Sequence, residues 1–183
     1  MKRCWWCGSD PSYVAYHDDV WGRPMHGERD LFEMLTLESF QSGLSWLTIL
    51  RKQEGFRRAF SGWDIEAIAA YGDHDSDRLM ADASIVRNRA KIEAAMANAR
   101  AVLALQGSGE TLDGLLWRFA PSAAPAPRTR DDVPGWTAES KAMAFELKRR
   151  GFRFVGPTTA YSLMQAAGLV NDHLADCAFR ALP

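Results

Sequence analysis

Four side chains of the kinds that bind zinc lie at the two ends of the chain. Cys4 and His17 are in the N-terminal segment, and His173 and Cys177 are close to the C-terminus. His173 and Cys177 have the spacing i and i+4, so one helical turn would direct both at a single ion. Two cysteines and two histidines make a closed tetrahedral ligand set, which is how structural zinc is held. The pattern predicts one structural zinc ion that joins the two ends of the domain.

A third cysteine, Cys7, follows Cys4 with the spacing of a zinc-knuckle or redox pair. It leaves open the alternative that Cys7 replaces one of the four ligands. Three cysteines cannot all pair as disulfides, and a reducing compartment favours thiols or bound metal. No apolar stretch approaches membrane-spanning length, and the N-terminus lacks an apolar signal core. We therefore expect a cytoplasmic protein that does not contact membranes.

A carboxylate shares the apolar face of a predicted helix. Glu38 lies at helical spacing from Leu31, Met34 and Leu35, which places it inside the core or at its edge. A buried carboxylate is unfavourable unless it is paired or has a chemical task. A carboxylate among aromatic rings suits a flat, cationic, hydrogen-bonding ligand, whereas a capping or salt-bridged Glu38 is the alternative. The aromatic residues that could surround it are Trp6, Tyr13, Tyr16 and Trp46.

A basic turn between two predicted helices is the third chemical feature. One helix ends near Arg150, a turn closes at Gly156, and a new helix begins at Pro157. The first N–H groups of a helix have no intrahelical partner and attract phosphate, and Thr158 and Thr159 add hydroxyl donors. This turn resembles a helix–hairpin–helix, a sequence-independent clamp on the DNA backbone. The alternative is that basic side chains simply favour a helix C-terminus. The expected DNA contacts are Arg150, Gly151, Arg153, Gly156, Thr158 and Thr159.

The elements that must position these residues are predicted to be helices. Ser45 and Asp64 are suitable caps for two of them, and glycine or proline separates most of the others. Convincing period-2 strands are absent. The fold class is therefore all-α, with one domain over residues 1–183. The predicted helices begin near Glu28 and cover approximately 46–52, 65–69, 85–105, 111–119, 137–150 and 157–167.

Composition limits the kind of protein. The chain has 183 residues, which suits one domain with a sizeable core, and a net charge of −1. It is therefore not a polycation that coats nucleic acid, and any DNA binding must come from a local patch and from shape. Four prolines interrupt the helical pattern over residues 121–136, which we interpret as an internal loop. We expect a monomer.

Longer motifs cover nearly the whole chain. They are Arg3-Cys4-Trp5-Trp6, residues 10–18, Leu31-Phe32-Glu33-Met34 with Leu37-Glu38, Gly43-Leu44-Ser45-Trp46, residues 151–156, residues 161–166 and residues 168–173. In combination they resemble the bacterial 3-methyladenine DNA glycosylase I family. The resemblance implies a helix–hairpin–helix repair enzyme that flips alkylated adenine out of duplex DNA. It would hydrolyse the N-glycosidic bond as a monofunctional glycosylase.

The same resemblance implies roles for individual residues. Glu38 would be the catalytic residue, and Tyr16 and Trp46 would form the pocket for the damaged base, with Trp6 and Tyr13 close by. One structural zinc would bind Cys4, His17, His173 and Cys177, whereas Cys7 departs from the family pattern.

Two further assignments concern catalysis and DNA distortion. Asp172 is a second candidate for assisting catalysis, although it adjoins His173 and more readily caps a helix or orients that ligand. Gly43 and Leu44 form a small residue and an apolar wedge that would fill the gap left by the extruded base.

Two other classes of protein compete with this interpretation. His17-Asp18-Asp19 could belong to a metal-dependent phosphohydrolase, with His26 or His74 as partners. A catalytic zinc needs an open position, however, and the Cys₂His₂ set would close it. A non-enzymatic helix–hairpin–helix DNA-binding module explains the basic turn, but it gives no task to Glu38 or to the N-terminal aromatic residues.

Overall fold

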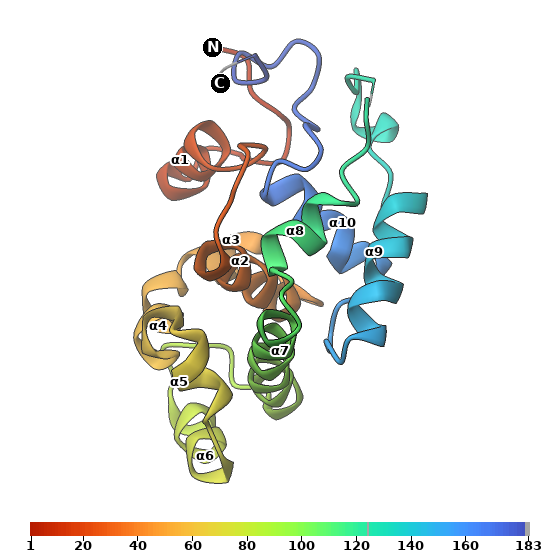
Figure 1. Cartoon of the computed structure of the whole chain (residues 1–183). Coiled ribbons are helices and arrows are strands. Elements are labelled where there is room, and N and C mark those ends of the chain that lie inside the picture. The colour runs from red at the N-terminus through yellow and green to blue at the C-terminus, as the bar shows by residue number, and fades with distance from the viewer. Residues whose placement is uncertain (124, 182–183) are drawn as a thin grey trace.

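Helices form every regular element in the described part of the chain, residues 1–123 and 125–181 of the computed structural model, which contains no strand (Figure 1). The all-α prediction is confirmed. None of the described helices is long and apolar enough to cross a bilayer. In chain order the α-helices are α1 (Pro11–Asp19), α2 (Glu28–Gln41), α3 (Trp46–Leu50), α4 (Gln53–Ala59), α5 (Ile65–Ala69), α6 (Asp73–Ala81), α7 (Arg89–Gly107), α8 (Leu112–Trp117), α9 (Ala138–Arg149) and α10 (Pro157–Ala166). The 3₁₀ turns are η1 (Ser61–Trp63) and η2 (Arg130–Asp132).

Side-chain caps set several helix starts where the sequence predicts them. Ser45 accepts from the Thr48 N–H at the start of α3, and Asp64 accepts from the Ala67 N–H at the start of α5. The predicted start at Ile85 is wrong, because α7 begins at Arg89. Asn88 is extended there and caps the helix by accepting from the Lys91 N–H. Helices α1, α4 and α6 are additions to the predicted set, and each is short.

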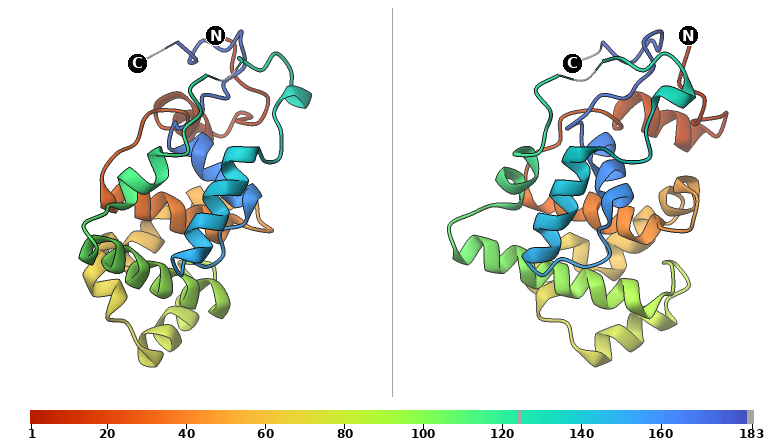
Figure 2. Two further views of the ribbon diagram at one scale, coloured as in Figure 1. Left: turned by 45° about the vertical axis from the view of Figure 1, so that its right-hand side comes forward. Right: turned by 90° about the vertical axis from the view of Figure 1, so that its right-hand side faces the viewer.

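Helix α2 runs through the centre of the molecule (Figure 2). Every residue from Leu31 to Phe40 is buried, because α3, α7, α8 and α10 pack around it. A helix enclosed on all sides has no solvated face on which to place a charge. Glu38 is therefore held inside the core by its position in α2, and its surroundings are fixed by the neighbouring helices.

The linker between α1 and α2 is attached to the end of α10. The N–H groups of Gly22 and Met25 donate to the carbonyls of Gln165 and Ala167. Gly168 has φ +73°, and a Cβ at this position would lie 2.4 Å from the carbonyl group of Arg23. Only glycine allows the two segments to approach this closely. The contact brings the N-terminal quarter of the chain against its C-terminal helix.

The predicted turn between two helices is present. α9 ends at Arg149, α10 begins at Pro157 with Gly156 as its N-cap, and the two helices pack against each other. Gly151 has φ +92° and Phe154 has φ +57°, so two left-handed residues reverse the chain within this short connection. We call residues 150–156 the hairpin.

Candidate functional site: an aromatic cavity beside a Cys₂His₂ cluster

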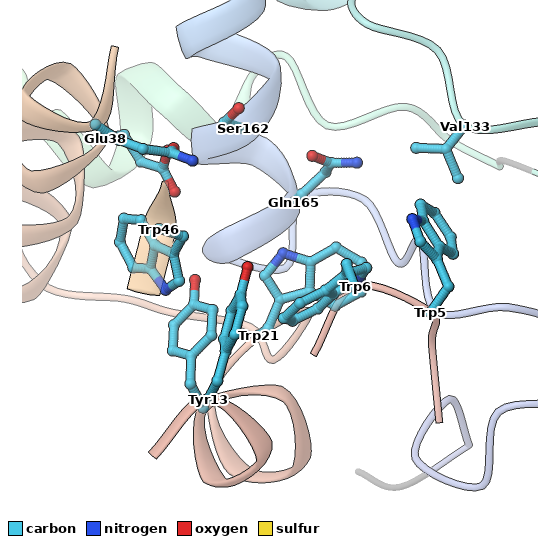
Figure 3. Close-up of a pocket in the computed structure, with 11 residues that line it drawn as sticks. Trp5, Trp6, Tyr13, Trp21, Glu38, Trp46, Val133, Ser162 and Gln165 are labelled. Carbon is cyan, nitrogen blue, oxygen red and sulfur yellow. The ribbon is translucent and has the colours of Figure 1, made fainter. Parts of the chain in front are cut away.

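The five predicted pocket residues line one cavity of about 200 Å³ (Figure 3). Trp6 comes from the N-terminal segment, Tyr13 and Tyr16 from α1, Glu38 from α2, and Trp46 from the first turn of α3. Four segments that are separate in the sequence thus meet around one space. Its size and flat walls suit a single planar heterocycle.

The aromatic rings hold one another at fixed angles. The Tyr16 and Trp46 ring centroids are 5.0 Å apart at an interplanar angle of 40°, and those of Trp6 and Tyr13 are 5.2 Å apart at 49°. Trp6 also meets Trp21 edge-on, with centroids 4.8 Å apart. Tilted and edge-on contacts of this kind are favourable between aromatic rings. The cavity walls are therefore preorganised by ring-to-ring packing.

Glu38 is the electrostatic feature of the cavity. Its side chain is 5% exposed, and its Oε2 atom has no hydrogen-bond partner among the described residues. Burial away from water raises the pKa of Glu38 to about 8. The indole Nε1 of Trp46 is likewise buried without a partner. An unpartnered carboxyl oxygen and an unpartnered indole N–H in one aromatic cavity are suited to a ligand that carries hydrogen-bonding edges.

Six further residues line the cavity, and their positions in the sequence do not predict it. Ser162 and Gln165 lie at i and i+3 on α10, a spacing that fits one helix face. Val133 comes from the proline-rich loop, where no residue pattern points to a cavity. The full set of additional lining residues is Trp5, Trp21, Gln41, Val133, Ser162 and Gln165.

Asp172 lies outside this lining set. Its Oδ2 accepts from the Tyr161 hydroxyl at 2.5 Å and from the Gln165 Nε2 at 2.8 Å. Asp172 is thus buried behind Gln165 and fixes the side-chain amide of a residue that faces the cavity. Assistance to catalysis by Asp172 stays a prediction, and the contacts favour an indirect route through Gln165.

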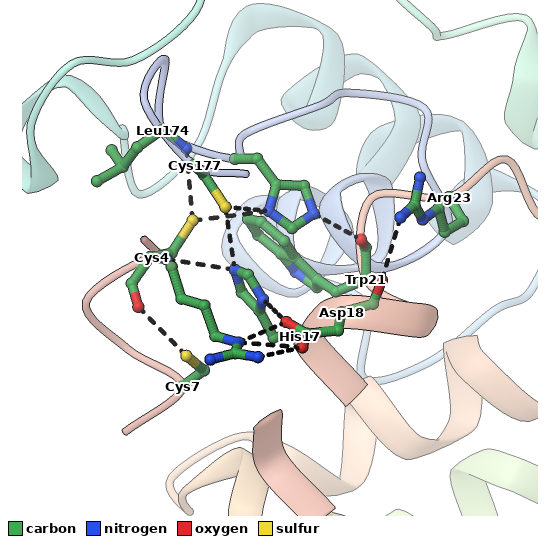
Figure 4. Close-up of polar contacts among 10 residues, drawn as sticks. Cys4, Cys7, His17, Asp18, Trp21, Arg23, Leu174 and Cys177 are labelled. Carbon is green, nitrogen blue, oxygen red and sulfur yellow. Dashed lines mark hydrogen bonds and ion pairs between the residues drawn. The ribbon is translucent and has the colours of Figure 1, made fainter. Parts of the chain in front are cut away.

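The four zinc-type side chains come together from both ends of the chain (Figure 4). The Cys177 Sγ lies 3.6 Å from the His17 Nε2 and 3.5 Å from the His173 Nδ1, and the Cys4 Sγ lies 3.7 Å from that same Nδ1. In a tetrahedron with Zn–S and Zn–N distances of about 2.3 and 2.0 Å, the S···N edges are roughly 3.5 Å. All four residues are buried. The geometry and the donor set both fit a single tetrahedral metal ion.

The outer contacts of the two histidines leave the correct ring nitrogens facing the cluster. The His17 Nδ1 lies 2.7 Å from the Asp18 carboxylate, and the His173 Nε2 lies 2.9 Å from the carbonyl oxygen of Trp21. Each of these nitrogens donates outward, which directs the other nitrogen inward as a ligand. Burial lowers the pKa of His173 to about 4, so the ring is neutral, as metal binding requires. Asp18 therefore orients the His17 ring. In the sequence, only its position next to His17 points to this role.

Cys7 lies beside the cluster but outside the four-residue set. Its thiol donates to the carbonyl oxygen of Cys4 at 3.3 Å. Of the two partners suggested for a phosphohydrolase site, His26 contacts Asp113 at the start of α8, and His74 is exposed on α6, outside the four-residue cluster. His17 therefore belongs to the closed Cys₂His₂ set. Among the described residues, that set leaves no open coordination position of the kind a catalytic metal in a phosphohydrolase needs.

A second cavity, of about 240 Å³, adjoins the first. It is lined by Gly43 and Leu44 from the α2–α3 turn and by Thr158 and Thr159 from the first turn of α10, and it shares Glu38 with the aromatic cavity. Leu44 is 41% exposed, and Gly43 has φ +82°. The predicted wedge and the predicted phosphate-binding helix end thus lie on either side of one opening.

The remaining predicted DNA contacts lie in the hairpin. Gly151, Arg153 and Gly156 line a shallow hollow on the surface. The guanidinium of Arg150 lies 2.6 Å from Glu110 and 2.5 Å from Glu146, so its charge is already paired within the protein. Its contact with DNA stays a prediction, and the ion pairs favour a role for Arg150 in holding α9 to the start of α8.

Comparisons with known proteins agree with one another. A family model described as methyladenine glycosylase matches residues 6–181. DNA-3-methyladenine glycosylase 1 of Escherichia coli (strain K12) is 46% identical over 97% of this chain and 96% of its own length. A crystal structure of a 3-methyladenine DNA glycosylase I superposes over 100% of both chains with a TM-score of 0.95 at 44% identity. A Staphylococcus aureus 3-methyladenine DNA glycosylase I, studied for its recognition of 3-methyladenine, gives a TM-score of 0.94 at 35% identity, over 100% of this chain and 98% of the other.

Proposed function

The chain belongs to the methyladenine glycosylase family, and we propose that its aromatic cavity holds the damaged base. The enzyme is a monofunctional DNA-3-methyladenine glycosylase that takes alkylated adenine out of duplex DNA and hydrolyses its N-glycosidic bond. The observation that carries the assignment of the cavity is the unpartnered Glu38 carboxyl group on an aromatic wall.

The chemistry of the substrate explains why this cavity suffices. N3-methyladenine is formally cationic while it is attached to the sugar, and it leaves as a neutral base, so the leaving group is already activated. Tyr16 and Trp46 stack the flipped base, and Glu38 accepts hydrogen bonds from its amino edge and favours its cationic form. Water then attacks the sugar through an oxocarbenium-like transition state. Trp6 and Tyr13 complete the wall.

DNA binding is assigned to the opening beside the cavity. The unpaired N–H groups at the start of α10, with Thr158 and Thr159, face one phosphate group of the DNA. Gly151, Arg153 and Gly156 let the sugar–phosphate backbone of the DNA pass close to the hairpin. Leu44, supported by Gly43, enters the duplex where the base has left. The exposure of Leu44 and its place at the rim of the second cavity support this role.

The Cys₂His₂ cluster is assigned to one structural zinc ion. When bound, zinc supplies four bonds that hold the N- and C-terminal segments together, and the closed ligand set gives it no place for substrate. His17 follows Tyr16 directly, and His173 donates to the Trp21 carbonyl. Two ligands are therefore tied to residues of the pocket wall. We further propose that the protein acts as a monomer in the cytoplasm.

The decisive experiment measures free 3-methyladenine released from alkylated duplex DNA by the purified protein, with zinc counted per chain. The wild-type chain should release the free base. Glu38→Gln should still bind the DNA, but it should release the free base roughly 10–100-fold more slowly, because a charged hydrogen bond to the base is lost. Unchanged release by Glu38→Gln would refute the assignment of Glu38. A non-enzymatic DNA-binding module would show binding and no release in either protein.

A further inference from the structure

Helix α7 carries two buried polar residues, Lys91 and Asn98, which have no role in the base pocket or the metal cluster. Lys91 is 7% exposed and Asn98 is fully buried. They are seven positions apart, which is about two helical turns, or roughly 10 Å along the axis. Apart from these two, the buried positions of α7 are all apolar. Buried polar side chains on an otherwise apolar face need hydrogen-bond partners, and Lys91 and Asn98 each find theirs in backbone groups.

Lys91 holds the end of α2. Its ammonium donates to the carbonyl oxygen of Phe40 at 2.9 Å and to that of Ser42 at 2.6 Å. These carbonyls belong to the C-terminal end of α2, where the partial charge of the helix is negative and a cation is favourable. Ser42 begins the turn that presents Gly43 and Leu44. The ammonium group thus fixes the base of that turn to α7.

Asn98 holds the hairpin. Its Nδ2 donates to the carbonyl oxygen of Arg153 at 3.2 Å, and its Oδ1 accepts from the Arg153 N–H at 2.7 Å. One side chain therefore satisfies both backbone groups of a single hairpin residue, as a neighbouring strand would. Phe154, which has φ +57°, follows directly. The hairpin is thus fixed to α7 immediately before Phe154, the second of its two left-handed residues.

We propose that Lys91 and Asn98 are positioning residues, which fix the spacing between the Gly43–Leu44 turn and the hairpin on the rigid frame of α7. The inference rests on the proposed function, in which these two segments grip the DNA on either side of the extruded base. Figure 2 shows α7 passing beneath both the α2 helix and the α9–α10 pair. Neither residue lines the aromatic cavity. The pair therefore affects how the duplex is positioned on the protein, and it does not affect the binding of the base.

The alternative is that both residues only satisfy polar groups in the core. That role would change stability alone. A spacing role would also weaken the productive binding of duplex DNA, while leaving the binding of a free base unchanged. The two roles therefore differ in which ligand is affected.

The experiment compares Lys91→Met, Asn98→Ala and the double variant with the wild-type enzyme. We measure KM and kcat for release of 3-methyladenine from alkylated duplex, Kd for free 3-methyladenine, and the free energy of unfolding. Each single variant should raise KM roughly tenfold, since each removes two hydrogen bonds, which are charged at Lys91 and neutral at Asn98. We expect kcat at saturating DNA and Kd for the free base to stay within about twofold, a change of less than about 0.5 kcal/mol.

The double variant adds a sharper test. Lys91 and Asn98 share no partner, so their effects on the free energy of unfolding should add. The spacing, however, is lost when either end is released, so KM of the double variant should exceed that of the single variants only slightly. KM values that multiply, or a Kd for the free base that rises in step with KM, would overturn the proposal.

Arg100 provides the matched control on the same helix. Its guanidinium donates to the carbonyl oxygens of Ala69 and Tyr71, at the end of α5 and away from the cavities. Arg100→Met removes the same kind of contact and should leave KM unchanged. A tenfold rise in KM for Arg100→Met would contradict the proposal. Should Lys91→Met not fold, Lys91→Arg keeps the charge and should retain most of the affinity for DNA. A wild-type enzyme that releases no 3-methyladenine would instead refute the proposed function itself.

Discussion

The contribution of Glu38 to the free energy of unfolding depends on pH. Burial raises the pKa of its carboxyl group to about 8 in the folded chain, from an ordinary value of 4.5. The folded state therefore keeps a proton that the unfolded chain has lost between these two pH values. The free energy of unfolding falls as pH rises through that window, by at most about 1.4 kcal/mol per pH unit. Below pH 4.5 both states are protonated, and the contribution is complete.

The first prediction follows from that sign. Glu38→Gln removes the titration, so the variant should lose less stability than the wild-type enzyme between pH 5 and pH 8. Denaturant unfolding of both proteins at the two pH values gives the comparison, because all other titrating groups are common to them. An identical pH dependence in the two proteins would show that Glu38 is already ionised in the empty cavity.

The second prediction concerns Leu44. Leu44→Ala should lower the excision rate roughly tenfold or more, because the gap left by the extruded base is no longer filled. It should change the free energy of unfolding by less than a buried leucine would, since Leu44 is 41% exposed. Val20→Ala, at another exposed apolar position, serves as the control and should excise normally. Unchanged DNA binding and excision by Leu44→Ala would rule out the wedge.

Residue types and spacing allowed the cavity to be predicted only in part. Glu38 was found because a charge shares a helix face with Leu31 and Leu35, and such a conflict is visible in the sequence. Gln165 gave no such signal, because a single uncharged polar residue near the end of a helix is ordinary. Its place at the cavity is decided by the packing of α10 on α2, which is a tertiary contact.

At the scale of elements, local capping was predictable and packing was not. The starts of α3 and α5 follow from Ser45 and Asp64, whose side chains act within one helical turn. The start of α7 was misplaced because residues 85–88 continue its apolar pattern while Asn88 ends them as extended chain. The pattern of burial alone does not distinguish a helix from an apolar segment that packs beside it.

The close contact between the α1–α2 linker and α10 gives the third prediction. Gly168→Ala should destabilise the fold by about 1–3 kcal/mol, because the new Cβ meets the Arg23 backbone and φ is positive. Gly107→Ala, in a helical position with open space around it, should be neutral or slightly stabilising. Thermal unfolding of the two variants tests the difference. Equal melting temperatures would show that the linker shifts away without loss.

At the scale of the whole molecule, the Cys₂His₂ cluster links the chain ends to the cavity through aromatic rings. Trp21 meets Trp6 and His173 edge-on, each with centroids 4.8 Å apart. Movement of His173 would therefore reach the cavity wall through one intervening side chain. The cluster and the cavity are two parts of one packed unit.

The fourth prediction is that metal removal acts on the fold before it acts on chemistry. Chelation should lower the melting temperature by roughly 10 °C, equivalent to a few kcal/mol for a chain of this size. Activity should fall only in proportion to the unfolded fraction, and it should return when zinc is restored. Loss of activity at a temperature where circular dichroism shows an intact fold would contradict a structural role. Cys177→Ala should reproduce the effect of the chelator, whereas Cys7→Ala should not.

The position of the four ligands also has a consequence for biosynthesis. A ribosome adds about 5–20 residues per second, so roughly 8 to 30 seconds separate the appearance of His17 from that of His173. Until His173 is added, the nascent chain holds only two of the four cluster residues, and until α10 is synthesised the linker that carries Trp21 has no helix to attach to. The cavity is therefore completed last, and a chain released early by the ribosome would lack a working base pocket.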